Sequence, residues 1–192
     1  MIQRSSPVLL KTRRFADDRG WFMETYSESG CAKQGIHDRF VQDNHSRSVF
    51  EGTIRGIHFQ KPPYAQAKLV RCVKGAIIDY AVDLRAGSPT YGKWLSAELS
   101  AENDFQLYVP VGYGHAFVTT QPDSEVVYKV SDVYAQDCEG GVIWNDAALG
   151  IDWKLPASGP VLSQKDAILS TLAEFESPFA YDGNPMEPLA TS

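Results

Sequence analysis

A histidine, a lysine and a tyrosine interrupt apolar, strand-like runs of this 192-residue chain, and each can gain or lose a proton. Side chains alternate between the two faces of a strand, so His58 lies on the face opposite Ile57 and Phe59. By the same rule, Lys68 and Tyr128 each share a face with apolar side chains of their own strand. Faces that mix polar and apolar side chains are expected of a barrel lumen that holds a ligand. The pattern therefore predicts a binding cavity inside a barrel.

Taken singly, each candidate has an ordinary structural explanation. A strand histidine is more often a hydrogen-bonded core or surface residue than a catalytic one. Lys68 alone reads as a surface lysine, and Tyr128 alone as a core residue with its hydroxyl at an edge. Asp166 alone reads as a carboxylate near the start of a helix. The functional interpretation depends on their combination.

The elements that must position these groups are short runs rich in Val, Ile, Tyr and Phe, at 52–60, 68–73, 76–84, 106–109, 116–119, 126–130 and 141–144. Turn signals separate them at intervals of about 8–12 residues, which favours a sandwich, jelly roll or barrel over a βαβ fold. Apolar spacing over 163–176 predicts one short helix. We expect one domain over residues 1–192, with an extended or loosely ordered tail from about residue 177.

The charge balance restricts the partners of the chain. Eighteen Lys and Arg against 24 Asp and Glu give a net charge of −6, which argues against general binding to nucleic acid or an anionic membrane. Any anionic ligand must be met by local cations. The N-terminus does not read as a signal peptide, and no run approaches the roughly 18 apolar residues of a transmembrane helix. Three widely spaced cysteines, Cys31, Cys72 and Cys138, fit a reducing compartment, so we expect a cytoplasmic protein.

The stretch from Pro110 to His115 has the Pro-x-Gly-x-x-His core of the second cupin motif, so the chain resembles the cupin superfamily. Metal-binding cupins have a second histidine where this chain has Gln60, and a glutamate where it has Lys68. Only His58 and His115 remain as ligands, fewer than the three protein ligands usual at a catalytic metal site. The replacements predict a site without a metal.

A closer resemblance runs from Arg13 to Asp166, in ordered blocks at 18–24, 40–46, 55–60, 66–71, 82–89, 110–117, 128–134 and 141–146. These blocks resemble the dTDP-4-dehydrorhamnose 3,5-epimerases. The resemblance implies an all-β, cupin-type jelly-roll barrel with short peripheral helices. It also implies a homodimer with exchanged N-terminal strands, a nucleotide-sugar substrate and no cofactor.

Residue by residue, the resemblance makes His58 the catalytic base and Asp166 the carboxylate that orients it. Lys68 lies near the substrate ketone and Tyr128 on the opposite side as acid. His115 corresponds to a second histidine of the pocket. The remaining matches are binding residues: Arg19, Phe22 and Glu24 hold the nucleotide from the partner subunit, and Gln42, Asn44, Arg55, Tyr134 and Lys165 lie near the sugar, diphosphate or base.

The implied substrate is a nucleotide 4-keto-6-deoxyhexose, whose C3 and C5 hydrogens are weakly acidic because both carbons adjoin the C4 carbonyl. Inversion needs proton removal from one face and return to the other. A neutral imidazole suits the removal, and a fixed ammonium can stabilise charge on the C4 oxygen where a metal otherwise serves. The diphosphate needs an arginine. Arg55 is near His58 in sequence, but alternation directs the two to opposite faces unless the strand bulges.

Three departures from the family pattern leave alternatives open. Val133 replaces the first of a usual tyrosine pair, Gly114 and Ala116 reverse the usual order around the pocket histidine, and Gln136 replaces a common proline. None falls on a catalytic position. The alternatives are an epimerase that inverts C3 alone, an epimerase of another nucleotide sugar, a metal-dependent cupin, and a catalytically silent binding module.

Overall fold

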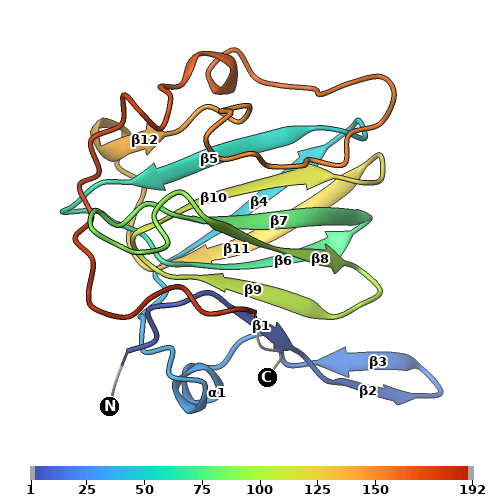
Figure 1. The fold of residues 1–192 in the computed structure, drawn as a ribbon. Coiled ribbons are helices and arrows are strands. Elements are labelled where there is room, and N and C mark those ends of the chain that lie inside the picture. The colour runs from blue at the N-terminus through green and yellow to red at the C-terminus, as the bar shows by residue number, and fades with distance from the viewer. Residues whose placement is uncertain (1–2, 190–192) are drawn as a thin grey trace.

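Two five-stranded antiparallel sheets face each other in the computed structural model, which describes residues 3–189 (Figure 1). The first sheet contains, in order, β1 (Val8–Lys11), β9 (Phe105–Val109), β6 (Lys68–Lys74), β11 (Ser124–Val130) and β4 (Gln42–Ser48). The second contains β12 (Glu139–Gly141), β5 (Ile54–Gln60), β10 (Tyr113–Thr119), β7 (Ala76–Asp83) and β8 (Trp94–Ser100). Most neighbouring strands are not consecutive in the chain, as expected for a jelly roll.

Apolar side chains fill part of the space between the sheets and also cover the outside of the second sheet. The inner cluster includes Val70 and Val126 from the first sheet and Phe117 from the second. The outer cluster packs Ile57 of β5 against the chain that follows β12, including Trp153. Because the second sheet is covered on both faces, β7 is almost continuously buried and does not alternate.

The predicted strands are confirmed for most of the barrel, with shifted ends. The prediction at 141–144 is wrong for three of its four residues, because β12 ends at Gly141. The predicted helix over 163–176 is also wrong, since this stretch contains only the 3-10 turn η2 (Asp166–Ile168). Its apolar residues do not share one helical face: Ile168 is 83% exposed, whereas Leu172 packs on the outer cluster.

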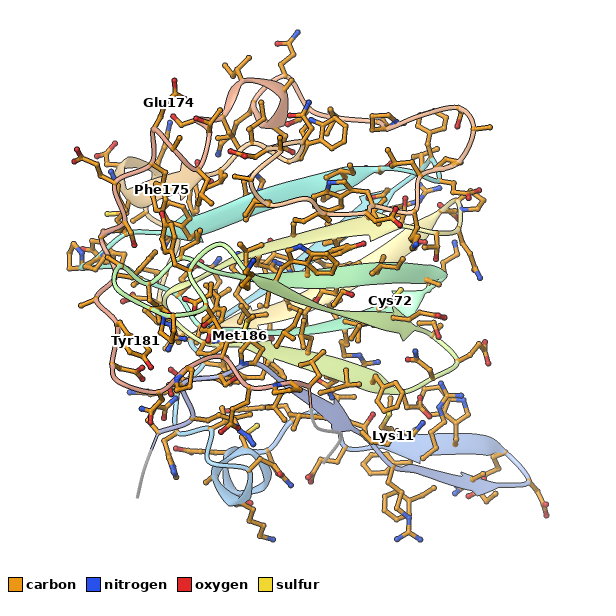
Figure 2. All side chains as sticks on the ribbon, in the orientation of Figure 1. Lys11, Cys72, Glu174, Phe175, Tyr181 and Met186 are labelled. Carbon is orange, nitrogen blue, oxygen red and sulfur yellow. The ribbon has the colours of Figure 1, made fainter. Side chains whose placement is uncertain are left out.

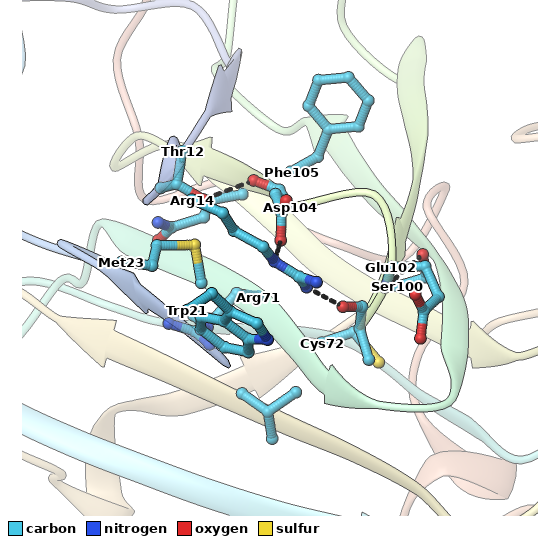
Figure 3. A pocket seen from close by; sticks show the side chains of 13 residues that line it. Thr12, Arg14, Trp21, Met23, Arg71, Cys72, Ser100, Glu102, Asp104 and Phe105 are labelled. Atoms are coloured by element: carbon cyan, nitrogen blue, oxygen red, sulfur yellow. Dashed lines mark hydrogen bonds and ion pairs between the residues drawn. The ribbon is translucent and has the colours of Figure 1, made fainter. Parts of the chain in front are cut away.

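A two-stranded hairpin, β2 (Arg14–Asp17) with β3 (Gly20–Met23), extends away from the barrel (Figure 1). Arg14 anchors it beside a pocket of about 220 Å³ (Figure 3). The Arg14 guanidinium forms an ion pair with Asp104 at 2.7 Å and lies 4.4 Å from the centroid of the Trp21 ring. The one α-helix described, α1 (Glu28–Lys33), follows, and no helix within residues 3–189 is long and apolar enough to cross a membrane.

The C-terminal segment 177–189 is extended and packs along the side of the barrel, where Figure 2 places Tyr181 and Met186. The guanidinium of buried Arg85 donates to Oδ1 of Asp182 and to the backbone oxygen of Asn184, both at 3.0 Å. Further along, the backbone N–H of Glu187 donates to Ser6 Oγ at 2.9 Å. The segment therefore joins the β7–β8 connection to the chain that precedes β1.

Candidate active site

A cavity of about 360 Å³ lies between the two sheets and brings together all four predicted catalytic residues. Strands β4, β5, β6, β10 and β11 supply most of its wall, and the chain just before and within η2 supplies the rest. The lining residues are Ser46, Thr53, Ile54, Arg55, His58, Lys68, His115, Phe117, Tyr128, Val161, Leu162, Ser163, Lys165 and Asp166.

His58 is held by the carboxylate of Asp166. The distance from His58 Nε2 to Asp166 Oδ1 is 2.5 Å, although 108 positions separate the two residues in the chain. Ser163 Oγ accepts the backbone N–H of Asp166 at 3.1 Å, which fixes the turn carrying the carboxylate. Burial opposes ionisation of Asp166, but the hydrogen bond and charge of His58 lower its pKa overall. The partner of His58 is therefore a carboxylate near pH 7.

A bulge in β5 places Arg55 and His58 on the same cavity. His115 of β10 pairs with His58, but Phe117, two residues further, pairs with Arg55, so β5 contains one extra residue there. Gly56 within this bulge has φ of +123°, and a Cβ at that position would lie 2.6 Å from the backbone oxygen of His115. The simple alternation that directs Arg55 away from His58 is therefore wrong at this point of the strand.

Lys68 and Tyr128 reach the cavity from the first sheet. In the β6–β11 register Val130 pairs with Lys68 and Val70 with Tyr128, so both polar side chains point inward from neighbouring strands. Burial lowers the pKa of Lys68 to about 8, although the negative charges of Asp79 and Glu139 oppose the shift. Burial also raises the pKa of Tyr128. Near pH 7 the site thus holds an ammonium and a protonated phenol.

His115 is the second histidine of the cavity, and its Nε2 lies 2.7 Å from Oδ1 of buried Asp79. Burial lowers the pKa of His115 and raises that of Asp79. The imidazole is therefore neutral near pH 7. The sequence reasoning missed Asp79, although a carboxylate between Ile78 and Tyr80 in an apolar strand signals a buried partner.

Two cations stand at the rim of the cavity. Arg55 and Lys165 are exposed, whereas Lys68 lies deeper and is only 9% exposed. The Lys165 Nζ forms an ion pair with Oε2 of Glu139 at 2.5 Å. Glu139 was also missed, because it lies in a three-residue strand with no pattern that marks it.

Three further predicted binding residues are joined to one another beside the cavity but are not in its wall. Gln42 Nε2 donates to Asn44 Oδ1 at 2.9 Å, and Gln42 Oε1 accepts the backbone N–H of Tyr134 at 3.1 Å. The ring of Tyr134 is exposed. This end of β4 thus presents an aromatic surface next to amide groups.

The predicted nucleotide-binding residues of the N-terminal hairpin are not brought to the cavity of the same chain. Arg19 pairs with Asp17, its neighbour in the turn, and Phe22 is 69% exposed. Glu24 accepts a hydrogen bond from Ser27 Oγ at 2.8 Å, beside the start of α1. None of the three residues lines the cavity between the sheets.

Gln60 stands where metal-binding cupins have a histidine, and its amide is engaged by loop backbone. Its Nε2 donates to the oxygens of Tyr64 at 2.7 Å and Val133 at 3.1 Å, while its Oε1 accepts the N–H of Ala135 at 2.8 Å. Within residues 3–189 no three His, Cys, Asp or Glu side chains gather closely enough to hold a metal ion.

Comparison with known proteins gives the family. The profile described as dTDP-4-dehydrorhamnose 3,5-epimerase matches residues 5–174. The chain belongs to this family. It is 47% identical over 173 residues to the dTDP-4-dehydrorhamnose 3,5-epimerase of Sinorhizobium fredii, covering 90% of this chain and 88% of that protein. Membership places the chain among the isomerases.

Two solved structures of the family are similar throughout. The Bacillus anthracis epimerase with TDP and pyrophosphate bound has a TM-score of 0.82 and 48% identity, over 86% of this chain and 93% of that one. A Legionella pneumophila 3,5-epimerase in complex with dTDP-4-keto-L-rhamnose has a TM-score of 0.88 and 35% identity, over 95% and 98%. The predicted cupin-type jelly roll is thereby confirmed.

Proposed function

We propose that this chain epimerises a dTDP-4-keto-6-deoxyhexose at C3 and C5, with His58 as base and Tyr128 as acid. One observation carries the proposal: the imidazole and the phenol reach the same cavity from opposite sheets, β5 and β11. Inversion of a carbon requires proton removal on one face and delivery on the other. The solved relatives with TDP or a dTDP-sugar bound support the nucleotide part of the assignment.

His58 takes the proton first. The carboxylate of Asp166 engages Nε2 at 2.5 Å, so Nδ1 is the nitrogen that accepts the substrate proton. Because Asp166 remains ionised, its charge stabilises the imidazolium as it forms.

Proton removal from C3 or C5 places negative charge on the C4 oxygen. The ammonium of Lys68 stabilises that enolate, since a fixed, buried charge acts more strongly than one in solvent. Tyr128 then protonates the carbon from the other face, and its raised pKa keeps the phenol protonated through neutral pH. His115 is neutral and contributes a hydrogen-bonding group to the same cavity.

Product analysis tests the proposed reaction. Incubation with dTDP-4-keto-6-deoxyglucose followed by NMR of the recovered sugar is expected to show inversion at both carbons. Inversion at C3 alone would limit the activity to one centre, and no inversion would contradict the proposal.

We also propose a homodimer in which the β2–β3 hairpin completes the partner's cavity. A two-stranded hairpin has little stability alone, and this one exposes the aromatic rings of Phe15, Trp21 and Phe22. Arg19 lies in the turn of the hairpin with its side chain 89% exposed, ready to meet the diphosphate of a ligand in the other subunit.

Complementation between two inactive variants tests this arrangement. His58→Asn and the double variant Arg19→Ala with Phe22→Ala are coexpressed to give mixed dimers. If the hairpin acts in the partner, one site of each mixed dimer keeps both His58 and an intact hairpin, so activity returns. If each hairpin serves its own chain, every site lacks one of the two and the mixture stays inactive.

A further inference from the structure

Ser46 is a polar residue of the cavity wall to which the mechanism gives no part. It lies on the inward-facing side of β4, paired with Val126 of β11, two positions from Asn44, which pairs with Tyr128. Its Oγ is shielded from solvent and has no hydrogen-bond partner among residues 3–189. A buried hydroxyl left unpaired is unfavourable, so such a group calls for an explanation.

Three neighbouring polar side chains each form a hydrogen bond within the protein. Ser48, the next inward residue of β4, accepts a hydrogen bond from Arg55 Nε at 3.2 Å. Thr53 also lines the cavity, and its Oγ1 donates to the backbone oxygen of Phe50 at 2.7 Å. Asn44 accepts from Gln42. Among the cavity-lining residues that the structure describes, Ser46 has the side-chain oxygen that is both shielded from solvent and unpaired.

The depth of Ser46 indicates which part of a ligand it meets. The exposed cations Arg55 and Lys165 mark the rim, where positive charge suits the diphosphate of the proposed substrate. Ser46 Oγ is shielded from solvent, in the wall that also contains His58 and Tyr128. The part of a nucleotide sugar that reaches this depth is the hexose.

We propose that Ser46 hydrogen-bonds a hydroxyl group of the hexose and thereby helps to select the sugar. This inference rests on the proposed function. Serine has a single side-chain torsion before the oxygen, so a change of rotamer about Cα–Cβ is the movement by which the shielded Oγ would meet a ligand. A neutral hydroxyl suits a sugar hydroxyl, whereas the charged phosphates are matched by the cations at the rim.

Binding of two nucleotides to three proteins tests the inference. Calorimetry compares dTDP with dTDP-glucose, which lacks the ketone and is not turned over, on the wild type, Ser46→Ala and Thr53→Val. Ser46→Ala is expected to weaken dTDP-glucose binding by about three- to tenfold, the range for one neutral hydrogen bond, and to leave dTDP binding unchanged.

Thr53→Val is the matched control, because it removes a cavity hydroxyl that is already bonded to the protein. It is expected to lower the midpoint of urea unfolding while binding both nucleotides normally. Ser46→Ala is expected to unfold no earlier than the wild type, since no protein hydrogen bond is lost.

Two results would overturn the inference alone: wild-type affinity of Ser46→Ala for dTDP-glucose, or an equal loss for dTDP and dTDP-glucose. Failure of the wild type to bind either nucleotide would instead overturn the proposed function, and the inference with it.

Discussion

His58 and Tyr128 line one cavity from opposite sheets of the barrel, 70 positions apart in the sequence. The two side chains lie in different environments. The imidazole is bonded to an ionised carboxylate, and the phenol is buried and stays protonated. In the proposed mechanism the base and the acid thus lie on the two sides of the space that the hexose would occupy.

Tyr128→Phe separates proton removal from inversion. The base, its carboxylate and Lys68 remain, so enolate formation should survive, while epimerised product should fall by about 10² to 10⁴-fold, the usual contribution of a positioned acid. Protons can still return from His58 to the original face. NMR of sugar recovered from heavy water should therefore show more deuterium at C3 and C5 than inversion, and inversion at the wild-type rate would remove Tyr128 as the acid.

The pH dependence of kcat should reflect Lys68. In the proposed mechanism its ammonium is the active form, and burial lowers its pKa to about 8, so kcat should fall as pH rises through about 8. The free energy of unfolding should instead rise with pH over the range above about 8. The ordinary lysine pKa is 10.5, so between about 8 and 10.5 the unfolded chain binds the extra proton and this group makes folding more favourable as pH rises.

Urea unfolding across that pH range checks the second half of this prediction. In Lys68→Met, the part of the increase in unfolding free energy with pH that comes from Lys68 should be absent. A kcat that stays constant to pH 10 would show that the ammonium is not needed for turnover.

Asp166→Asn should lower kcat by about 10²-fold or more, because a neutral amide cannot stabilise the imidazolium as a carboxylate does. Affinity for dTDP should change little, since Asp166 is bonded to His58 and lies below the cationic rim. Steady-state kinetics and calorimetry on the same variant measure both effects. Unchanged kcat would mean that His58 does not need its carboxylate.

Gly56→Ala tests the bulge that brings Arg55 and His58 together. The added Cβ would lie 2.6 Å from both the His115 oxygen and the Ala116 Cβ, at a φ of +123° that other residues rarely adopt. We expect the free energy of unfolding to fall by about 2 kcal/mol or more. Gly87→Ala is the control, because nothing lies within 4 Å of its added Cβ at a similarly positive φ.

Removal of metals should leave activity unchanged. Lys68 and Gln60 replace two ligands of metal-binding cupins, and the Gln60 amide is engaged by three backbone groups. Activity is measured before and after treatment with a chelator. A loss that a divalent cation restores would contradict this account.

The sequence predicts most strands of the two sheets because apolar and β-branched residues gather in short runs between turn signals. On β6 and β11, alternation also predicts which side chains face the lumen. Lys68 and Tyr128 follow that rule. Arg55 does not, because a bulge depends on how β5 pairs with β10, and pairing is a property of two strands. The same limit hid Asp79, whose role depends on His115 from another strand, and Asp166 could be joined to His58 only through the family resemblance.

Hydrogen exchange by His58→Asn in heavy water tests the central claim most directly. The wild type should incorporate deuterium at both C3 and C5 of dTDP-4-keto-6-deoxyglucose, as seen by NMR. The variant should incorporate none above the uncatalysed rate while binding dTDP with nearly wild-type affinity. Wild-type exchange at either carbon by His58→Asn would contradict the assignment of His58 as the base.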